Sequence, residues 1–203
     1  MSIRNRAIDE ICRQLKRLKA NEFEVRLRTQ FGSPEGNTEE LLQLMTKDFN
    51  LIRGRNDKTN LFVGRFFGAI LMIELKLESV LMKVDPEIES SMLGKKIDVY
   101  SRLLKVLATQ PYGFEADEIA TYRSFIGPLR ELSKIRNKMA HDLSYTRFGL
   151  VDIPEVVKLV KRRKPSLMVA AKSVPRDFKP IIAVHYFAFM VAENAASLQM
   201  FLA

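Results

Sequence analysis

The chain has very few of the residues that build disulfide frameworks or metal sites. Its 203 residues include one cysteine, Cys12, and two histidines, His141 and His185. A lone cysteine excludes an internal disulfide and is typical of a reducing compartment. No second histidine, cysteine or acidic pair has metal-ligand spacing with His141, so we expect no metal ion. Phosphate-binding and dinucleotide-binding glycine motifs are also absent from the sequence, and we expect no cofactor.

Long uninterrupted apolar runs are missing as well. Residues 61–77 are broken by charged side chains, and residues 181–192 are fewer than the ~20 that a membrane-spanning helix needs. Basic residues are spread through residues 1–19, which therefore do not resemble a signal peptide. We expect a cytoplasmic protein with no membrane association.

Helical periodicity dominates what is present. Apolar residues recur at spacings of three and four, which predicts an all-α fold. Helices are expected at about 3–30, 38–53, 60–83, 94–109, 115–126, 128–141, 154–164 and 181–202, with a kink or break at Gly127-Pro128. Residues 166–174 could instead be extended. Breaker residues at 54–57 separate a basic amphipathic helical extension, residues 1–58, from a helical domain, residues 59–203.

Positive charge is concentrated in one region. The chain carries a net charge of +9, and residues 130–180 hold 13 lysines and arginines against 5 acidic residues. Such a concentration is expected of a protein that binds nucleic acid, where cations neutralise phosphates. The candidates for these contacts are Lys138, Lys161, Arg162, Arg163 and Lys164. A solvated helix end is the alternative explanation for the run at 161–164.

The most informative motif follows the expected break at Gly127-Pro128. Arg136-Asn137-Lys138-Met139-Ala140-His141 places a guanidinium, an amide and an imidazole within six residues. Asn137 and His141 are four apart and share a helix face, whereas Arg136 lies about 140° away from His141 and must reach round. This combination suits a site that handles phosphate near neutral pH.

The motif resembles the R-x4-6-H signature of the HEPN superfamily, all-helical domains common among prokaryotic toxins and antiviral ribonucleases. Residues 66–83 are similar to an earlier HEPN core helix with embedded glutamates, and residues 93–104 are similar to the segment that often follows it. The resemblance covers roughly residues 59–203 and implies an HEPN-like helical bundle. Residues 1–58 have no counterpart in it.

The resemblance implies a metal-independent endoribonuclease. His141 would act as general base or acid, Arg136 would stabilise the scissile phosphate, and Asn137 would orient the phosphate or the histidine. It further implies RNA as substrate, a homodimer with two motifs in one cleft, and room for an antitoxin or regulatory protein as a partner. Tyr145 stands four residues after His141 rather than two, a departure from toxins that are controlled by tyrosine modification.

Two supporting glutamates and the second histidine have ordinary alternatives. Glu74 and Glu78 lie four apart on an apolar helix, where they could orient Arg136, serve the site directly or form boundary salt bridges. His185 lies in the apolar stretch 181–189 and is expected to be a hydrogen-bonded core or interface residue rather than a catalytic one.

Two rival functions remain open. The first is a non-catalytic HEPN-like interaction or regulatory module, similar in class to the mannitol-repressor group, in which Arg136 and His141 are structural. The second is a DNA-binding helix-turn-helix protein, which is disfavoured because no short glycine-bearing turn joins two suitable helices next to the basic region.

Overall fold

The computed structural model describes residues 55–109, 115–142, 144–167, 171 and 174–202. The expected N-terminal extension lies outside the described residues, except for its last four positions. These four belong to helix α3, Arg55–Leu81, so the boundary expected between residues 58 and 59 falls inside a helix. All regular elements in the described part of the chain are helical, which confirms the all-α prediction.

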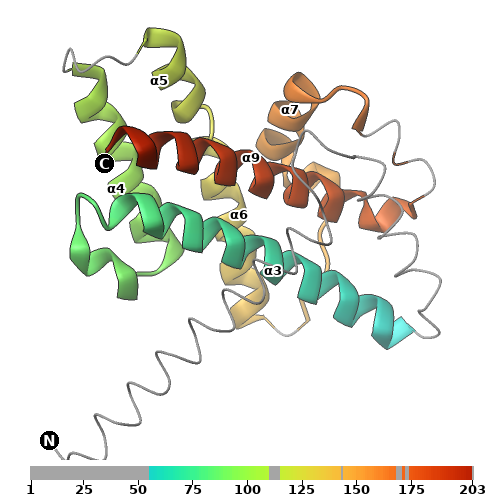
Figure 1. Ribbon diagram of the computed structural model, residues 1–203. Coiled ribbons are helices and arrows are strands. Elements are labelled where there is room, and N and C mark those ends of the chain that lie inside the picture. Colours follow the sequence, from blue (N-terminus) through green and yellow to red (C-terminus); the bar gives the residue numbers. More distant parts are fainter. Residues whose placement is uncertain (1–54, 110–114, 143, 168–170, 172–173, 203) are drawn as a thin grey trace, which may run out of the picture.

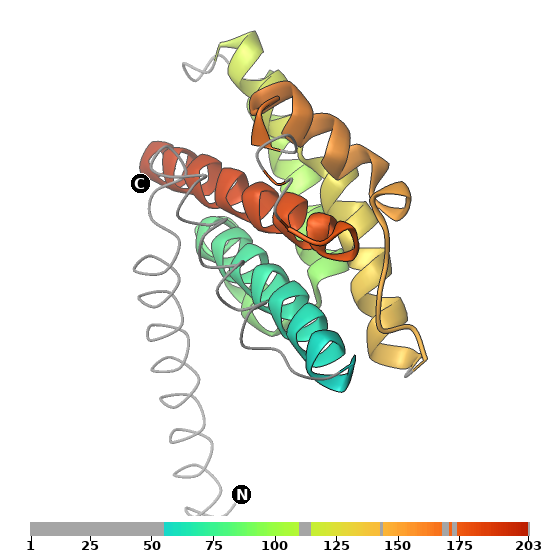
Figure 2. The same ribbon diagram turned by 90° about the vertical axis from the view of Figure 1, so that its right-hand side faces the viewer.

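Two long helices form the centre of the molecule. Helix α3 and the terminal helix α9, Lys179–Phe201, run side by side in the same direction (Figures 1 and 2). Buried side chains on α3 recur at helical spacing, as in Phe62, Phe66, Ile73 and Leu77, and α9 is buried along most of its first three turns. Burial of these apolar faces, rather than helix propensity alone, stabilises the pair.

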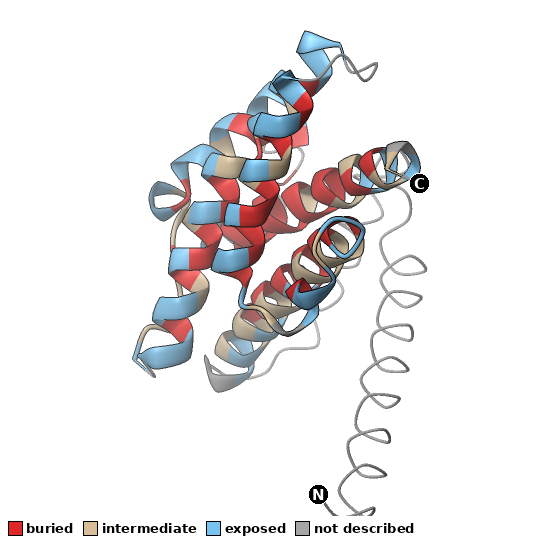
Figure 3. Cartoon of the chain, turned by 90° about the vertical axis from the view of Figure 1, so that its left-hand side faces the viewer, coloured by how far each residue is buried: buried red, intermediate tan, exposed pale blue. Residues whose placement is uncertain are grey.

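The remaining helices pack across this pair. They are α4 (Leu93–Thr109), α5 (Ala116–Arg123), α6 (Ile126–His141) and α7 (Pro154–Arg163), with short 3₁₀ turns at Pro86–Ser90, Leu150–Asp152 and Arg176–Phe178. Helix α6 contacts α4, α7 and α3, while α7 contacts α9. Figure 3 shows buried residues on the faces that the helices turn toward one another and exposed residues on the outside.

Helix α9 is the one described helix long and apolar enough to cross a membrane, counted with the turn before it as Arg176–Met200. This segment of 25 residues is longer than the apolar stretch 181–192, which the sequence predicted to be too short to span a membrane. A buried core helix has the same length and composition, and 67% of its most apolar window is buried inside the protein. Its place between α3 and α7 explains its apolar character.

The break before α6 lies earlier than expected. The chain turns at Ser124 and Phe125, where the Ser124 hydroxyl donates to the Thr121 carbonyl at 2.6 Å. Gly127 and Pro128 then lie in the first turn of α6. A proline is accommodated there because the first N–H groups of a helix have no partner inside the helix.

The segment considered for a strand has helical turns at Leu167 and Ala171 and a bend at Val174. Leu167 and Ala171 are both fully buried and lie in such turns, while residues 168–170 and 172–173 lie outside the described residues. No strand is therefore seen in the described part of 166–174.

Candidate functional site

The motif lies on the last two turns of α6. That helix buries Leu129, Leu132, Ile135 and Met139 against the core. The same periodicity leaves an exposed row of polar residues on the opposite side, which we call the α6 stripe: Arg130, Lys134, Asn137, Lys138 and His141. Asn137 and His141 thus share one face of α6, as the sequence predicted, and both are exposed to solvent.

Arg136 lies at the edge between the buried and exposed faces. Its Nη1 donates to Asn137 Oδ1 at 3.3 Å, and its Nε lies 3.9 Å from Glu74 Oε1 on α3. Glu74 Oε1 is buried and accepts no hydrogen bond from the described residues. Among these residues, the positive charge of Arg136 is the group that offsets the cost of burying this carboxylate oxygen. The guanidinium is therefore held from two sides.

The two glutamates of α3 have different partners. Glu78 Oε2 lies 2.5 Å from Nζ of Lys96, a lysine of α4 that is only 4% exposed. Glu78 therefore joins α3 to α4 instead of orienting Arg136. Of the two supporting residues suggested by the sequence, only Glu74 contacts the motif.

His141 is exposed at the final residue of α6. The described residues give its imidazole no hydrogen bond or ion pair, with Arg136 or with any other group. The next residue, Asp142, accepts hydrogen bonds from the hydroxyl and the backbone N–H of Ser144 at 2.5 and 2.9 Å. These hydrogen bonds to Ser144 lower the pKa of Asp142 from its usual value.

Lys138 is directed toward the segment after the helix. Its ammonium lies 3.9 Å from the centre of the Tyr145 ring, a cation–π contact. Burial, followed by the charge of Asp152, raises the pKa of Tyr145. The contact fixes residues 144–146 beside the last turn of α6.

The basic run at the end of α7 is far from the motif. Helix α7 begins beside Glu131, which accepts the backbone N–H groups of Glu155 and Val156 at 3.2 and 3.0 Å. It ends toward α5, where Arg163 Nη2 donates to Thr121 Oγ1 at 3.4 Å. From Glu131 to His141 is about 15 Å along α6, in the other direction.

Lys161, Arg162, Arg163 and Lys164 therefore lie at the opposite end of the α6–α7 pair from His141 (Figure 2). We expected these residues near the motif because they follow it in the sequence. The direction of α7 separates them in space.

His185 is a core residue of α9, as the sequence favoured. It is 1% exposed, and burial and then the positive charge of Arg65 lower its pKa to about 3. The imidazole is therefore neutral at pH 7. It lies outside the motif, on a helix that forms the core.

Arg147, which no sequence motif singled out, links three segments. Its Nη2 donates to Thr59 Oγ1 at the start of α3, and its Nη1 donates to Asp177 Oδ2, both at 3.2 Å. A run of hydroxyl-bearing residues before an arginine and an aromatic residue, Ser144-Tyr145-Thr146-Arg147-Phe148, was the available signal.

The described residues contain no group of three or more His, Cys, Asp or Glu side chains arranged to hold a metal ion. Comparisons with protein-family models, curated protein sequences and solved structures find no match to this chain. Its function is therefore inferred from the residues themselves.

Proposed function

We propose that the chain is an HEPN-type endoribonuclease that cleaves RNA without a metal ion. The observation that carries the proposal is the Arg136–Asn137 pair, held by Glu74, with exposed His141 one helical turn beyond Asn137. A fixed guanidinium and an accessible imidazole on the same two turns of α6 are the two groups that RNA cleavage needs, a phosphate ligand and a proton carrier.

In the proposed reaction, the ribose 2′-oxygen attacks the adjacent phosphorus and the bond to the 5′-oxygen breaks. His141 takes the 2′-OH proton as general base, or gives a proton to the leaving 5′-oxygen as general acid. Arg136 offers N–H donors to the phosphate oxygens, whose charge grows in the transition state. The products are a 2′,3′-cyclic phosphate and a 5′-hydroxyl.

One imidazole cannot serve as both base and acid within a single concerted step. We therefore propose a homodimer in which two copies of α6 meet and each copy supplies one histidine. Exposed Asn137 and His141 on the α6 stripe leave the motif accessible to a second copy and to RNA. A prokaryotic toxin or antiviral role, with an antitoxin or regulatory partner, belongs to the same proposal.

For RNA binding we propose the α6 stripe in place of the run at 161–164. Lys134 and Lys138 are exposed and lie on the same helix face as His141, and cations near a helix C-terminus are favoured by the helix dipole. An RNA strand bound to these two lysines would also reach His141, whereas an RNA strand bound at the end of α7 would not.

The competing function is a non-catalytic interaction module similar in class to the mannitol-repressor group. It is favoured by the 3.9 Å contact between Arg136 and Glu74, since an ion pair between α6 and α3 can be purely structural. In such a module the α6 stripe would contact a partner protein, and His141 would transfer no proton.

Product chemistry separates the two functions. The purified chain, incubated with single-stranded RNA in EDTA, should leave 2′,3′-cyclic phosphate ends. A DNA strand of the same nucleotide sequence should stay intact, because it lacks the 2′-hydroxyl that acts as the nucleophile. Ends that carry a 5′-phosphate, or equal cleavage of the deoxy strand, would rule out attack by the 2′-oxygen. Intact RNA at high protein concentration would favour the interaction module.

A further inference from the structure

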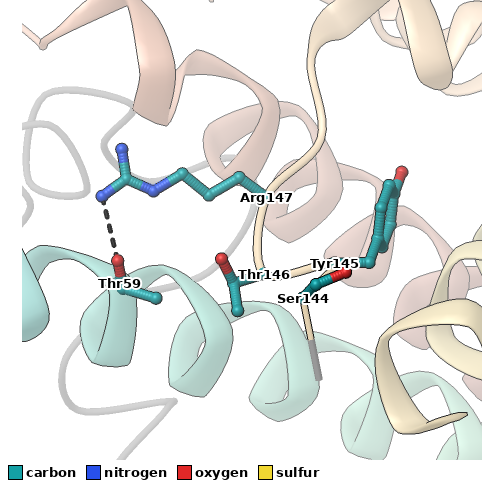
Figure 4. Close-up of a pocket in the computed structure, with 5 residues that line it drawn as sticks. All are labelled: Thr59, Ser144, Tyr145, Thr146 and Arg147. Atoms are coloured by element: carbon teal, nitrogen blue, oxygen red, sulfur yellow. Dashed lines mark hydrogen bonds between the residues drawn. The ribbon is translucent and has the colours of Figure 1, made fainter. Parts of the chain in front are cut away.

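A polar pocket lies directly after the motif, between the first turn of α3 and the segment that follows α6. It has a volume of about 250 Å³ and is lined by Thr59, Ser144, Tyr145, Thr146 and Arg147 (Figure 4). Four of its five lining residues carry hydroxyl groups and the fifth carries a guanidinium. We propose that this pocket binds the phosphate and ribose of an RNA nucleotide next to the cleavage site, which rests on the proposed nuclease function.

Arg147 is the group that would hold the phosphate. A guanidinium has five N–H donors, and the hydrogen bonds to Thr59 and Asp177 use two of them among the described residues. Figure 4 shows the side chain extended along the pocket toward Thr59. Phosphate is matched to the planar donor set of arginine.

Asp177 does not prevent an anion from binding there. The side chains of Arg147 and Asp177 are 35% and 46% exposed, and exposed ion pairs contribute little to stability. A phosphate can therefore displace this carboxylate from Arg147. Lys138, over the ring of Tyr145, adds a second positive charge at the side of the pocket nearest the motif.

The pocket is held in shape by an aromatic cluster beneath it. Phe148, the residue after Arg147, lies edge-on to Phe62 and Phe66 of α3 with ring centres 5.1 and 5.0 Å apart. Phe178, the residue after Asp177, lies 5.6 Å from Phe62. Arg147 and Asp177 each stand next in sequence to a ring of this cluster, which fixes their backbone. The polar groups of the pocket are therefore in place before a ligand binds, and this lowers the entropic cost of binding.

The hydroxyls give the pocket a preference for ribose phosphate over a bare anion. The half-buried Thr146 hydroxyl makes no hydrogen bond with the described residues, and the Ser144 oxygen can still accept after donating to Asp142. Hydroxyl groups that donate and accept suit both phosphate oxygens and the ribose 2′-OH. The pocket is small for a whole nucleotide with its base, so the base would lie outside it.

The test measures binding of adenosine 3′-monophosphate, a product-like probe, by calorimetry. We expect adenosine and inorganic phosphate each to bind at least about tenfold more weakly than the probe. Arg147→Gln should weaken probe binding about ten- to a hundredfold, because a charge-assisted hydrogen bond is removed. Lys105→Gln, which removes one exposed charge from α4, is the matched control and should bind as wild type.

Arg147 also bridges two segments, so its replacement can disturb the fold. Thr146→Val is therefore a second variant that tests the pocket without breaking this bridge. It removes one hydroxyl, keeps the shape of the side chain and should weaken binding several-fold at an unchanged melting temperature. Equal affinity of wild type and Thr146→Val, together with equal affinity of a folded Arg147→Gln, would overturn the pocket assignment. Failure of the wild type to bind the probe at millimolar concentration would overturn it as well.

Cleavage assays separate this proposal from the nuclease itself. His141→Ala should lose cleavage and keep its affinity for the probe. Probe binding through Arg147 without any cleavage by the wild type would end the nuclease proposal and leave the pocket as a nucleotide site. Cleavage with an unchanged KM in Arg147→Gln and Thr146→Val would leave the nuclease standing and remove the pocket.

Discussion

Glu78 and Lys96 form a largely buried ion pair that joins α3 to α4, with 2.5 Å between Oε2 and Nζ. The lysine side chain is 5% exposed and the glutamate side chain 19%. A lysine this deeply buried is tolerated because its counter-charge is in contact with it. The pair therefore fixes the part of α3 that also carries Glu74, the residue that holds Arg136.

Removing the carboxylate should destabilise the fold strongly. Glu78→Gln leaves the Lys96 cation buried without a counter-charge, which costs about 3–5 kcal/mol in the free energy of unfolding. Urea denaturation measures this decrease. The control is Asp98→Asn, which breaks the exposed Arg130–Asp98 pair and should cost less than about 1 kcal/mol. A cost for Glu78→Gln as small as that of the control would show that the buried pair is energetically unimportant.

Buried His185 should make stability depend on pH. Burial and Arg65 lower its folded pKa to about 3 from 6.5, so between these values the unfolded chain binds a proton that the folded chain does not. Stability should therefore be complete above pH 6.5 and fall by about 1.4 kcal/mol per pH unit below it, until the folded pKa is reached.

Melting temperatures between about pH 7 and pH 5 test this, because most carboxylates titrate below that window. His185→Gln should reduce the slope with pH, whatever its effect on absolute stability. Equal slopes for wild type and His185→Gln would mean that His185 is protonated in the folded state.

Substitutions on the α6 stripe and in the run at the end of α7 should have different effects on RNA binding. Replacing Lys134 and Lys138 by Gln should weaken binding and lower the slope of log affinity against log salt by about 0.7 for each phosphate that is no longer neutralised. Replacing Lys161 and Arg162 by Gln removes the same charge and should change neither quantity. The reverse result would return the RNA-binding surface to the end of α7.

Much of the helical layout could be predicted because its signals are local. The stretch from Gly94 to Thr109 corresponds to α4, and the helix from Pro154 ends one residue before the expected Lys164. Apolar periodicity and the position of proline determine such bounds within a few residues. The break before α6 was misplaced because Pro128 is compatible with a first helical turn as well as with a break.

The site was less predictable because its partners are distant in the chain. Glu74 and Glu78 share a face of α3, yet one contacts α6 and the other α4, a choice that depends on how those helices cross. Arg147 contacts residues 30 and 88 positions away, which no local pattern reveals. The position of the run at 161–164 follows from the direction of α7, which the sequence leaves open.

The most direct test of the nuclease proposal is the rate at which the purified chain cleaves a labelled single-stranded RNA in EDTA, compared with His141→Ala. Because His141 is exposed at the end of α6, its replacement should leave the melting temperature unchanged. We predict a rate about 10²- to 10⁴-fold lower in the variant, the usual contribution of a general acid or base. Equal rates for the two folded proteins would contradict the assignment of His141 and, with it, the proposed mechanism.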